Sequence, residues 1–337
     1  MSPKGVFTQS NEAEANRVFG YWRGDDGRLT GPVVVPTGGR GDGVPHLTSQ
    51  GSVVVTSDGG RLLVANAGSN DVSVISVGSE PMVVAIAPSA GSAPKSVAEH
   101  DGLVYVLNTA DRSLAGFTLG GEGLELLTES RRQLSDDADA AQVGFTPNGS
   151  ALVVTDRGAN AILVFPVADD GRLGKPHTTA SSGPTPYGFT FAAGDTLVVT
   201  EAFGAAKGKA AASSYRLNGR GAEIVSESVG NGRTEICWAV PSNDGRYVFS
   251  TNFADGAVSR YAVNADGELV LEDAAAGVAV DGEPGLRDED LTGDGRFLYA
   301  VDADGGRIFG WRVEDGALTA LGSWEGLPAT VAGLAAT

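Results

Sequence analysis

The chain has 337 residues, of which 42 are acidic and 24 are basic, and its formal net charge is −18 at pH 7. This charge disfavours nucleic acid and anionic membrane surfaces as partners. No apolar run approaches the ~20 residues that a membrane-spanning helix needs, and the N-terminus shows no apolar signal segment, so we expect a cytoplasmic protein. The single cysteine, Cys237, excludes an intramolecular disulfide.

A strand–turn–strand pattern begins at Gly5–Trp22 and recurs along the chain. It is most regular in Asp58–Val77, where an Asp-Gly turn precedes the apolar run Leu62–Ala65 and Asn66 ends the strand. Valine and isoleucine then alternate with serine in Val72–Val77, which is typical of a strand packed on one face. Later copies lie at Leu103–Leu119, Ala151–Val167, Thr196–Gly204, Tyr247–Val263 and Phe297–Val313.

The first strand of each copy ends on a polar residue. These residues are Gln9, Asn66, Asn108, Asp156, Glu201, Asn252 and Asp302. After a first interval of 57 residues, their spacings range from 42 to 51. The spacings average about 47 residues, and an all-strand repeat of this size predicts a β-propeller of about seven blades.

The two ends of the chain are predicted to share one blade. The N-terminal segment supplies three strands, beginning with Gly5–Gln9, but lacks the innermost one, and Gly326–Ala336 supplies a last short strand. Pairing them closes the ring and removes exposed sheet edges. We therefore expect an all-β, seven-bladed propeller with four antiparallel strands per blade, as one domain over residues 1–337; six or eight blades are the alternatives. Gly/Ser/Pro-rich links such as Gly78–Pro94 are expected to be loops.

The repeat resembles that of YVTN-type propellers. The full pattern, including the closing segment Gly326–Ala336, is similar to the seven-bladed lactonase-like family of bacterial propeller 6-phosphogluconolactonases and fungal carboxymuconate cycloisomerases. Members carry a GPRH-type motif before the first strand of a middle blade, where this sequence has Gly183–Pro186, and a following glutamate, which Glu201 matches. The resemblance implies a small-molecule hydrolase or isomerase that acts on a lactone or related cyclic ester.

Five residues share one register, about seven positions before the glycine of the first hairpin in their blades. They are Lys95, Gln142, Tyr187, Trp238 and Asp288. A core position would carry valine or isoleucine there, so this polar and aromatic ring predicts a substrate-binding pit at the mouth of the channel. Glu201 is predicted to be the acid or base at the pit wall, and Arg157, with Lys95, to stabilise an oxyanion or a carboxylate. His46 lies on a link that faces the pit and is the second catalytic candidate.

Several alternatives stay open. The strand-ending asparagines are more simply explained by local turn contacts than by chemistry. The Ala/Gly-rich segment Ala202–Ser213 is either a lid or a tolerated insertion. No cofactor is expected, although the acidic stretches Ser135–Asp139 and Arg287–Asp290 offer oxygen ligands that a divalent cation could use. A non-catalytic propeller that binds a ligand or another protein is the alternative to an enzyme, since propellers host both.

Overall fold

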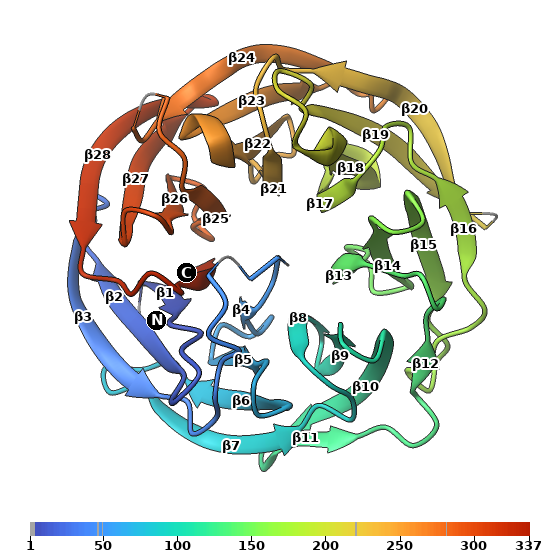
Figure 1. Ribbon diagram of the computed structural model, residues 1–337, viewed down its shortest axis with the longest axis vertical. Helices are drawn as coiled ribbons and strands as arrows, with labels where there is room; N and C mark the ends of the chain where they lie inside the picture. Colours follow the sequence, from blue (N-terminus) through green and yellow to red (C-terminus); the bar gives the residue numbers. More distant parts are fainter. Residues whose placement is uncertain (1–3, 46, 49, 220, 281) are drawn as a thin grey trace. The chain divides into compact units, whose positions relative to one another are not determined.

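A computed structural model describes residues 4–337 except 46, 49, 220 and 281. The described chain forms seven antiparallel sheets of four or five strands, accompanied by short 3-10 turns (Figure 1). This architecture confirms the predicted seven-bladed propeller. Two compact units are distinguished along the chain, Met1–Val154 with Phe165–Lys175 and Leu327–Thr337 as unit 1, and Thr155–Val164 with Pro176–Gly326 as unit 2. A single domain over residues 1–337 stays a prediction.

Three sheets lie wholly in unit 1. The first has the order β29 (Ala332–Ala336), β1 (Gly5–Gln9), β2 (Arg17–Arg23) and β3 (Leu29–Pro36). The second has the order β4 (Val53–Val55), β5 (Arg61–Asn66), β6 (Asp71–Ser76) and β7 (Met82–Pro88). The third contains β8 (Pro94–His100), β9 (Leu103–Asn108), β10 (Ser113–Gly120), β11 (Gly123–Leu126) and β12 (Arg132–Gln133).

Three further sheets lie wholly in unit 2. The first contains β17 (Pro186–Ala192), η1 (Ala193–Asp195), β18 (Thr196–Glu201), η2 (Phe203–Ala205), β19 (Ala211–Asn218) and β20 (Gly221–Gly230). The second contains β21 (Ile236–Pro241), β22 (Tyr247–Asn252), η3 (Phe253–Asp255), β23 (Ala257–Val263) and β24 (Leu269–Val278). The third contains β25 (Leu286–Leu291), β26 (Phe297–Asp302), β27 (Arg307–Glu314) and β28 (Ala317–Glu325).

The seventh sheet has its strands divided between the two units. Its order is β13 (Ala140–Phe145), β14 (Ala151–Asp156), β15 (Ala161–Pro166) and β16 (His177–Ala180). Among the described residues, no helix is long and apolar enough to cross a membrane.

The two ends of the chain meet in one sheet of unit 1, as predicted. β29 pairs antiparallel with β1, placing Val6 opposite Ala336 and Phe7 opposite Ala335. The Thr8 hydroxyl reinforces the pair by donating to the Gly333 carbonyl at 2.6 Å. The N and C marks lie close together beside these strands (Figure 1). The late strand covers an edge that β1 would otherwise expose to other chains.

The apolar runs of the second strands are explained by burial on both faces. In β5, Leu62 and Val64 pack in a cluster with Phe7 of the preceding sheet. Leu63 faces the other way and packs with Val106 of the following sheet. A strand between two neighbouring sheets therefore lacks the alternation of apolar and polar residues seen when one face meets solvent.

The polar residues that end the second strands are buried and join three segments. Asn66 donates to the Ser73 hydroxyl at 2.7 Å and accepts a hydrogen bond from Thr37 at 2.8 Å. Asn252 repeats the arrangement by donating to Ser259 at 2.9 Å. Each serine is the third residue of the next strand. Each bond therefore ties two strands of one sheet, which supports the structural explanation of the asparagines.

Two expectations from the sequence are corrected. The link Gly78–Pro94 was expected to be a loop, but it contains the outermost strand β7. Exposed and half-buried residues alternate along β7, because an edge strand packs on one side only, and its Gly/Ser/Pro flanks obscured the pattern. The loop after β18 was expected to reach Ser213, but β19 already begins at Ala211.

Candidate active site

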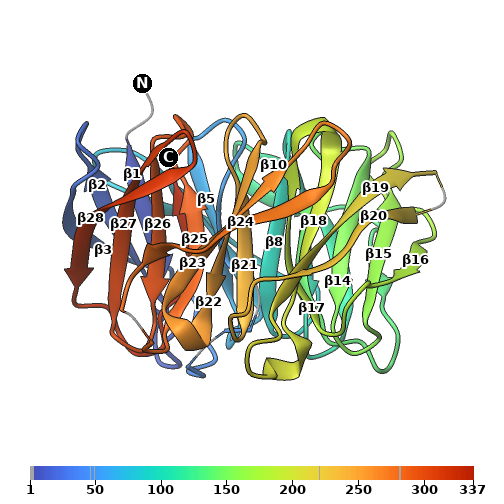
Figure 2. The ribbon, with the colours of Figure 1, turned by 90° about the horizontal axis from the view of Figure 1, so that it is seen from above.

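A pocket of about 220 Å³ lies in unit 2. It is built from the turn after β14, the residues around the start of β17 and of β21, the turns η2 and η3, and β25. Its lining residues are Arg157, Thr185, Tyr187, Ala202, Gly204, Ala205, Glu235, Ile236, Cys237, Phe253 and Arg287. Figure 2 shows η2 and η3 as two coiled turns at the same edge of unit 2. At the ~30 Å³ that one molecule of liquid water occupies, the cavity has room for about seven waters.

Tyr187 lines the pocket and packs against a second aromatic residue, Trp238. The ring of Tyr187 lies 4.6 Å from that of Trp238, centroid to centroid, and Trp238 is fully buried behind it. The Arg157 guanidinium lies 4.9 Å above the Tyr187 ring, a cation–π contact. Burial raises the pKa of the Tyr187 phenol well above its ordinary value, so the hydroxyl stays protonated and can donate a hydrogen bond at neutral pH.

A second arginine of the pocket lining, Arg287, lies in strand β25 and supplies a further positive charge. Arg287, in β25, is 9% exposed, and its guanidinium lies 4.2 Å above the Phe253 ring. The Nε atom of Arg287 is buried and has no hydrogen-bond partner among the described residues. A guanidinium removed from water binds a carboxylate or phosphate more strongly than an exposed one, because water competes less.

The chain next to Arg287 is acidic and buried. Asp288 and Glu289 are each 3% exposed. Burial raises the pKa of Glu289 well above its ordinary value, which favours its neutral form. The charge of Asp288 adds to burial in raising the pKa of Tyr187, so the acid lies near that wall of the pocket.

Cys237 lines the pocket as an unreactive thiol. It is 5% exposed, and burial raises the pKa of the thiol to about 12. Its Sγ donates to the Glu235 carbonyl at 3.5 Å. A thiol that stays protonated is a small apolar group and a poor nucleophile.

Four non-glycine residues in or next to the pocket lining have left-handed backbone. The φ angles are +61° at Thr185, +50° at Phe203, +63° at Ala205 and +54° at Glu235. None of these residues is glycine, so each pays a steric penalty for its conformation. Strain of this kind gathers at sites where a side chain or a loop must be held in place for function.

Glu201 is the last residue of β18 and is not among the residues that line the pocket. Its carboxylate is fully buried and accepts hydrogen bonds from the Gly183 N–H at 2.8 Å, from the Ser213 hydroxyl at 2.5 Å and from the Ser228 hydroxyl. Ser213 has the register in β19 that Ser73 has in β6, so Glu201 repeats the arrangement of the strand-ending asparagines. A side chain on Gly183 would collide with this carboxylate.

The remaining predicted residues are distributed over both units. Tyr187, Trp238, Asp288 and Arg157 belong to unit 2, and two of them, Tyr187 and Arg157, line the pocket. In unit 1, Lys95 forms an ion pair with Asp42, with 3.0 Å between Nζ and Oδ2, and Gln142 is buried at 9% exposure. His46 lies outside the described residues. Convergence of the whole predicted ring on one cavity stays a prediction.

Glu235, Arg287 and Phe253 line the pocket but were not predicted from the sequence. Arg287 was treated as part of an acidic stretch, and Glu235 was not considered. A usable signal was present, because Glu235 directly precedes β21 and Arg287 is the second residue of β25, so both charged residues lie close in sequence to members of the predicted ring. Among the described residues, no group of three or more His, Cys, Asp or Glu side chains is placed to hold a metal ion.

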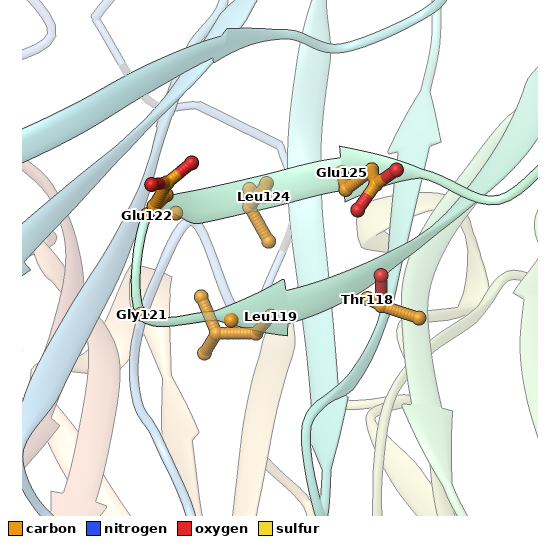
Figure 3. Close-up of a pocket in the computed structure, with 8 residues that line it drawn as sticks. Thr118, Leu119, Gly121, Glu122, Leu124 and Glu125 are labelled. Carbon is orange, nitrogen blue, oxygen red and sulfur yellow. The ribbon is translucent and has the colours of Figure 1, made fainter.

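A larger hollow, of about 570 Å³, lies over the hairpin of β10 and β11 in unit 1 (Figure 3). Glu122 and Glu125 are its charged lining residues, and both are exposed. An open hairpin that carries carboxylates offers neither enclosure nor a cation for a small acidic molecule. The pocket in unit 2 is therefore the better candidate site.

Comparison with known proteins supplies the family. The model of the seven-bladed β-propeller lactonases matches residues 122–203 and 200–330, which together span 209 of the 337 residues. The chain belongs to this lactonase family. The matched part of this lactonase-family protein includes every residue that lines the pocket.

Individual relatives of this lactonase-family chain are distant. A 6-phosphogluconolactonase of Yersinia pestis (strain Pestoides F) is 32% identical over 95 residues, which are 26% of this chain and only 28% of that protein. Among solved structures, a candidate 6-phosphogluconolactonase from Bacteroides fragilis superposes with a TM-score of 0.77 at 16% identity, covering 99% of this chain and 98% of the other. The periplasmic gluconolactonase of Pseudomonas aeruginosa gives 0.70 at 18% identity, covering 98% of each. At these identities the structural matches establish the fold.

Proposed function

We propose that this lactonase-family protein hydrolyses a small lactone that carries a negatively charged group, and that the pocket in unit 2 is its active site. The observation that carries the proposal is Arg287, whose guanidinium is nine-tenths buried, borders the pocket and leaves Nε without a partner among the described residues. A buried guanidinium nitrogen without a hydrogen-bond partner is costly, and a carboxylate or phosphate on the substrate would relieve that cost. Membership of the lactonase family supports the reaction type.

The other lining groups fit the same reaction. Arg157 lies over the Tyr187 ring and supplies a second positive charge for a developing oxyanion. Tyr187, held against Trp238, is a rigid wall with a protonated hydroxyl. The volume of about 220 Å³ suits a single ring rather than an oligosaccharide.

The remaining parts of the proposal come from the sequence. From the sequence, Lys95, Gln142, Trp238 and Asp288 are candidates for substrate binding, and His46 and Glu201 for acid–base chemistry. The buried hydrogen bonds of Glu201 favour a structural role for that residue instead. The partner is a small molecule rather than nucleic acid or a membrane, the reaction needs no cofactor, and the enzyme works in the cytoplasm.

The test is a panel of neutral, carboxylated and phosphorylated lactones, assayed with and without EDTA. Arg287→Met should raise KM for the acidic lactones by about 10- to 100-fold, because a hydrogen bond to a charged group contributes about 1.5–3 kcal/mol, and should change KM for neutral lactones far less. The matched control is Arg246→Met, an exposed arginine in the same unit. No turnover of any lactone by the wild type, or equal effects of both substitutions, would overturn the proposal.

A binding protein without turnover is the second candidate. It is favoured by Glu201, the family glutamate, whose two oxygens already accept hydrogen bonds within the sheet. In that case, calorimetry with the same lactones would show that the acidic ones bind and that Arg287→Met weakens their binding. The activity assay would detect no release of hydroxy acid.

A further inference from the structure

Glu235 occupies a backbone position that recurs in this protein. In four sheets, the carbonyl of the residue before the innermost strand accepts a hydrogen bond from the first residue after the second strand. These carbonyls belong to Ala93, Thr185, Glu235 and Gly285, at 3.0, 3.0, 2.8 and 2.8 Å. All four residues have positive φ angles, of 53°, 61°, 54° and 137°. The position is therefore defined by its backbone and places no demand for a charged side chain.

Glutamate is a poor residue for this conformation. Glycine, which stands at 285, adopts a positive φ without a steric penalty. Thr185 offsets its penalty with a side-chain contact, since its hydroxyl accepts the Gly204 N–H at 3.0 Å. Among the described residues, the Glu235 carboxylate makes no hydrogen bond or ion pair. Local rules that are broken without a structural gain mark functional positions.

Glu235 is one of the residues that line the pocket, and it is half-buried. Its negative charge raises the pKa of Cys237, although less than burial does, and the positive charge of Arg287 acts on the same thiol in the opposite direction. The charges of Glu235 and Arg287 are therefore both close enough to affect the Cys237 thiol. A carboxylate and a buried guanidinium facing one small cavity are the two groups that ester hydrolysis needs.

We propose that Glu235 is the general base of the lactone hydrolysis, an assignment that rests on the proposed function of this pocket. The carboxylate takes a proton from a water molecule, and the water oxygen bonds to the lactone carbonyl carbon. The carbonyl π electrons move to oxygen, and Arg287 and Arg157 stabilise that oxyanion. Collapse of the intermediate breaks the ring C–O bond, and the proton held by Glu235 passes to the leaving alkoxide. Lactone and water give one hydroxy acid, and Glu235 is regenerated.

The experiment compares Glu235→Gln, Glu235→Asp and Glu235→Gly with the wild type on the acidic lactone that the wild type turns over fastest. The matched control is Glu272→Gln. It removes a carboxylate of the outer strand β24 that forms an ion pair with Arg260 of β23. A positioned general base contributes about 10²–10⁴-fold, so Glu235→Gln should lower kcat by at least 100-fold with KM nearly unchanged. Glu235→Asp should restore part of that loss. Glu235→Gly removes the steric penalty of the positive φ angle, so its melting temperature should be no lower than that of the wild type. It should be as inactive as Glu235→Gln, and loss of activity in this variant could not be attributed to misfolding.

The pH profile separates a base from a structural residue. The charged and titratable groups around Glu235 include Arg157, Arg287, Tyr187 and Cys237 of the pocket lining. Two acids add to them: Asp288, whose charge acts on the same thiol as Glu235, and Asp255 of η3, whose carboxylate accepts the Thr234 N–H at 2.6 Å. The acidic limb of the wild-type kcat profile should disappear in Glu235→Gln and should persist in Glu272→Gln.

Three outcomes would overturn the assignment. If Glu235→Gln retains kcat within threefold of the wild type, Glu235 is not the general base, but the proposed lactonase activity is unaffected. A raised KM with unchanged kcat makes Glu235 a partner of the arginines instead. Absence of lactone turnover by the wild type removes the proposed function and this assignment together.

Discussion

The role of Glu201 can be decided by a stability measurement. The structure shows a fully buried carboxylate whose Oε1 accepts the Gly183 N–H and the Ser213 hydroxyl and whose Oε2 accepts the Ser228 hydroxyl. We predict that Glu201→Ala destabilises the fold strongly, because these donors lose their common acceptor in a dry site.

The magnitude follows from the contacts. Leaving the buried Gly183 N–H unsatisfied costs about 1–3 kcal/mol, and the serine hydroxyls can turn to other acceptors only in part. The cavity left by the deleted atoms adds to this loss. A total of about 3–5 kcal/mol is expected. Glu201→Gln should cost only about 1–2 kcal/mol, because its amide oxygen still accepts two of the three bonds while its NH₂ group donates to Ser228.

The assay is urea unfolding followed by tryptophan fluorescence, with lactone turnover measured on the same samples. Asn252→Ala is the matched control, since Asn252 holds Ser259 as Glu201 holds Ser213. Residual activity of folded Glu201→Gln should stay near that of the wild type. Glu201→Ala with unchanged unfolding free energy, or folded Glu201→Gln with kcat reduced 100-fold, would refute the structural reading and return Glu201 to catalysis.

Two further predictions concern ionisable groups elsewhere. Burial opposes ionisation of Asp42, but hydrogen bonds from Lys95 and Asn11 outweigh it and lower the pKa of Asp42 below its ordinary 3.8. The stabilisation by ionised Asp42 is therefore complete above about pH 4 and is lost as the pH falls through the lowered pKa. The difference in unfolding free energy between the wild type and Lys95→Met should therefore become smaller in acid. A difference that stays constant down to pH 2 would contradict the lowered pKa of Asp42. For Cys237, a pKa of about 12 in place of 9.0 reduces the thiolate fraction at pH 8 about 1000-fold. Iodoacetamide should therefore label the thiol of the native protein far more slowly than that of the urea-unfolded protein. Equal labelling rates would show that the thiol is not buried.

The sequence alone was sufficient for the fold. Buried second strands such as Leu62–Ala65 read as apolar runs because neighbouring sheets cover both faces, and each run ends at a polar residue such as Asn66. That local signal repeats, so the number of blades follows from counting it. The incomplete N-terminal repeat and the leftover strand after Gly326 predicted the shared blade in the same way.

Outer strands were harder to predict because their signal is weak. β7 packs on one side only, and its exposed Met82, Val84 and Ile86 are flanked by residues typical of loops. Neither burial on both faces nor a clear turn signal separates such a strand from a link.

The candidate site was settled only by the tertiary structure. Register placed Tyr187 and Trp238 in one predicted ring, and the structure brings the two side chains into contact. Glu235 and Arg287 gain their significance from meeting at one cavity, although 51 residues separate them in the chain. The sequence likewise could not show that Glu201 is held by Gly183 and Ser228, because hydrogen-bond partners depend on which loops the sheets bring together. Repetition in a sequence fixes where strands lie, whereas burial, charge and contact among residues of different blades exist only once those blades are packed.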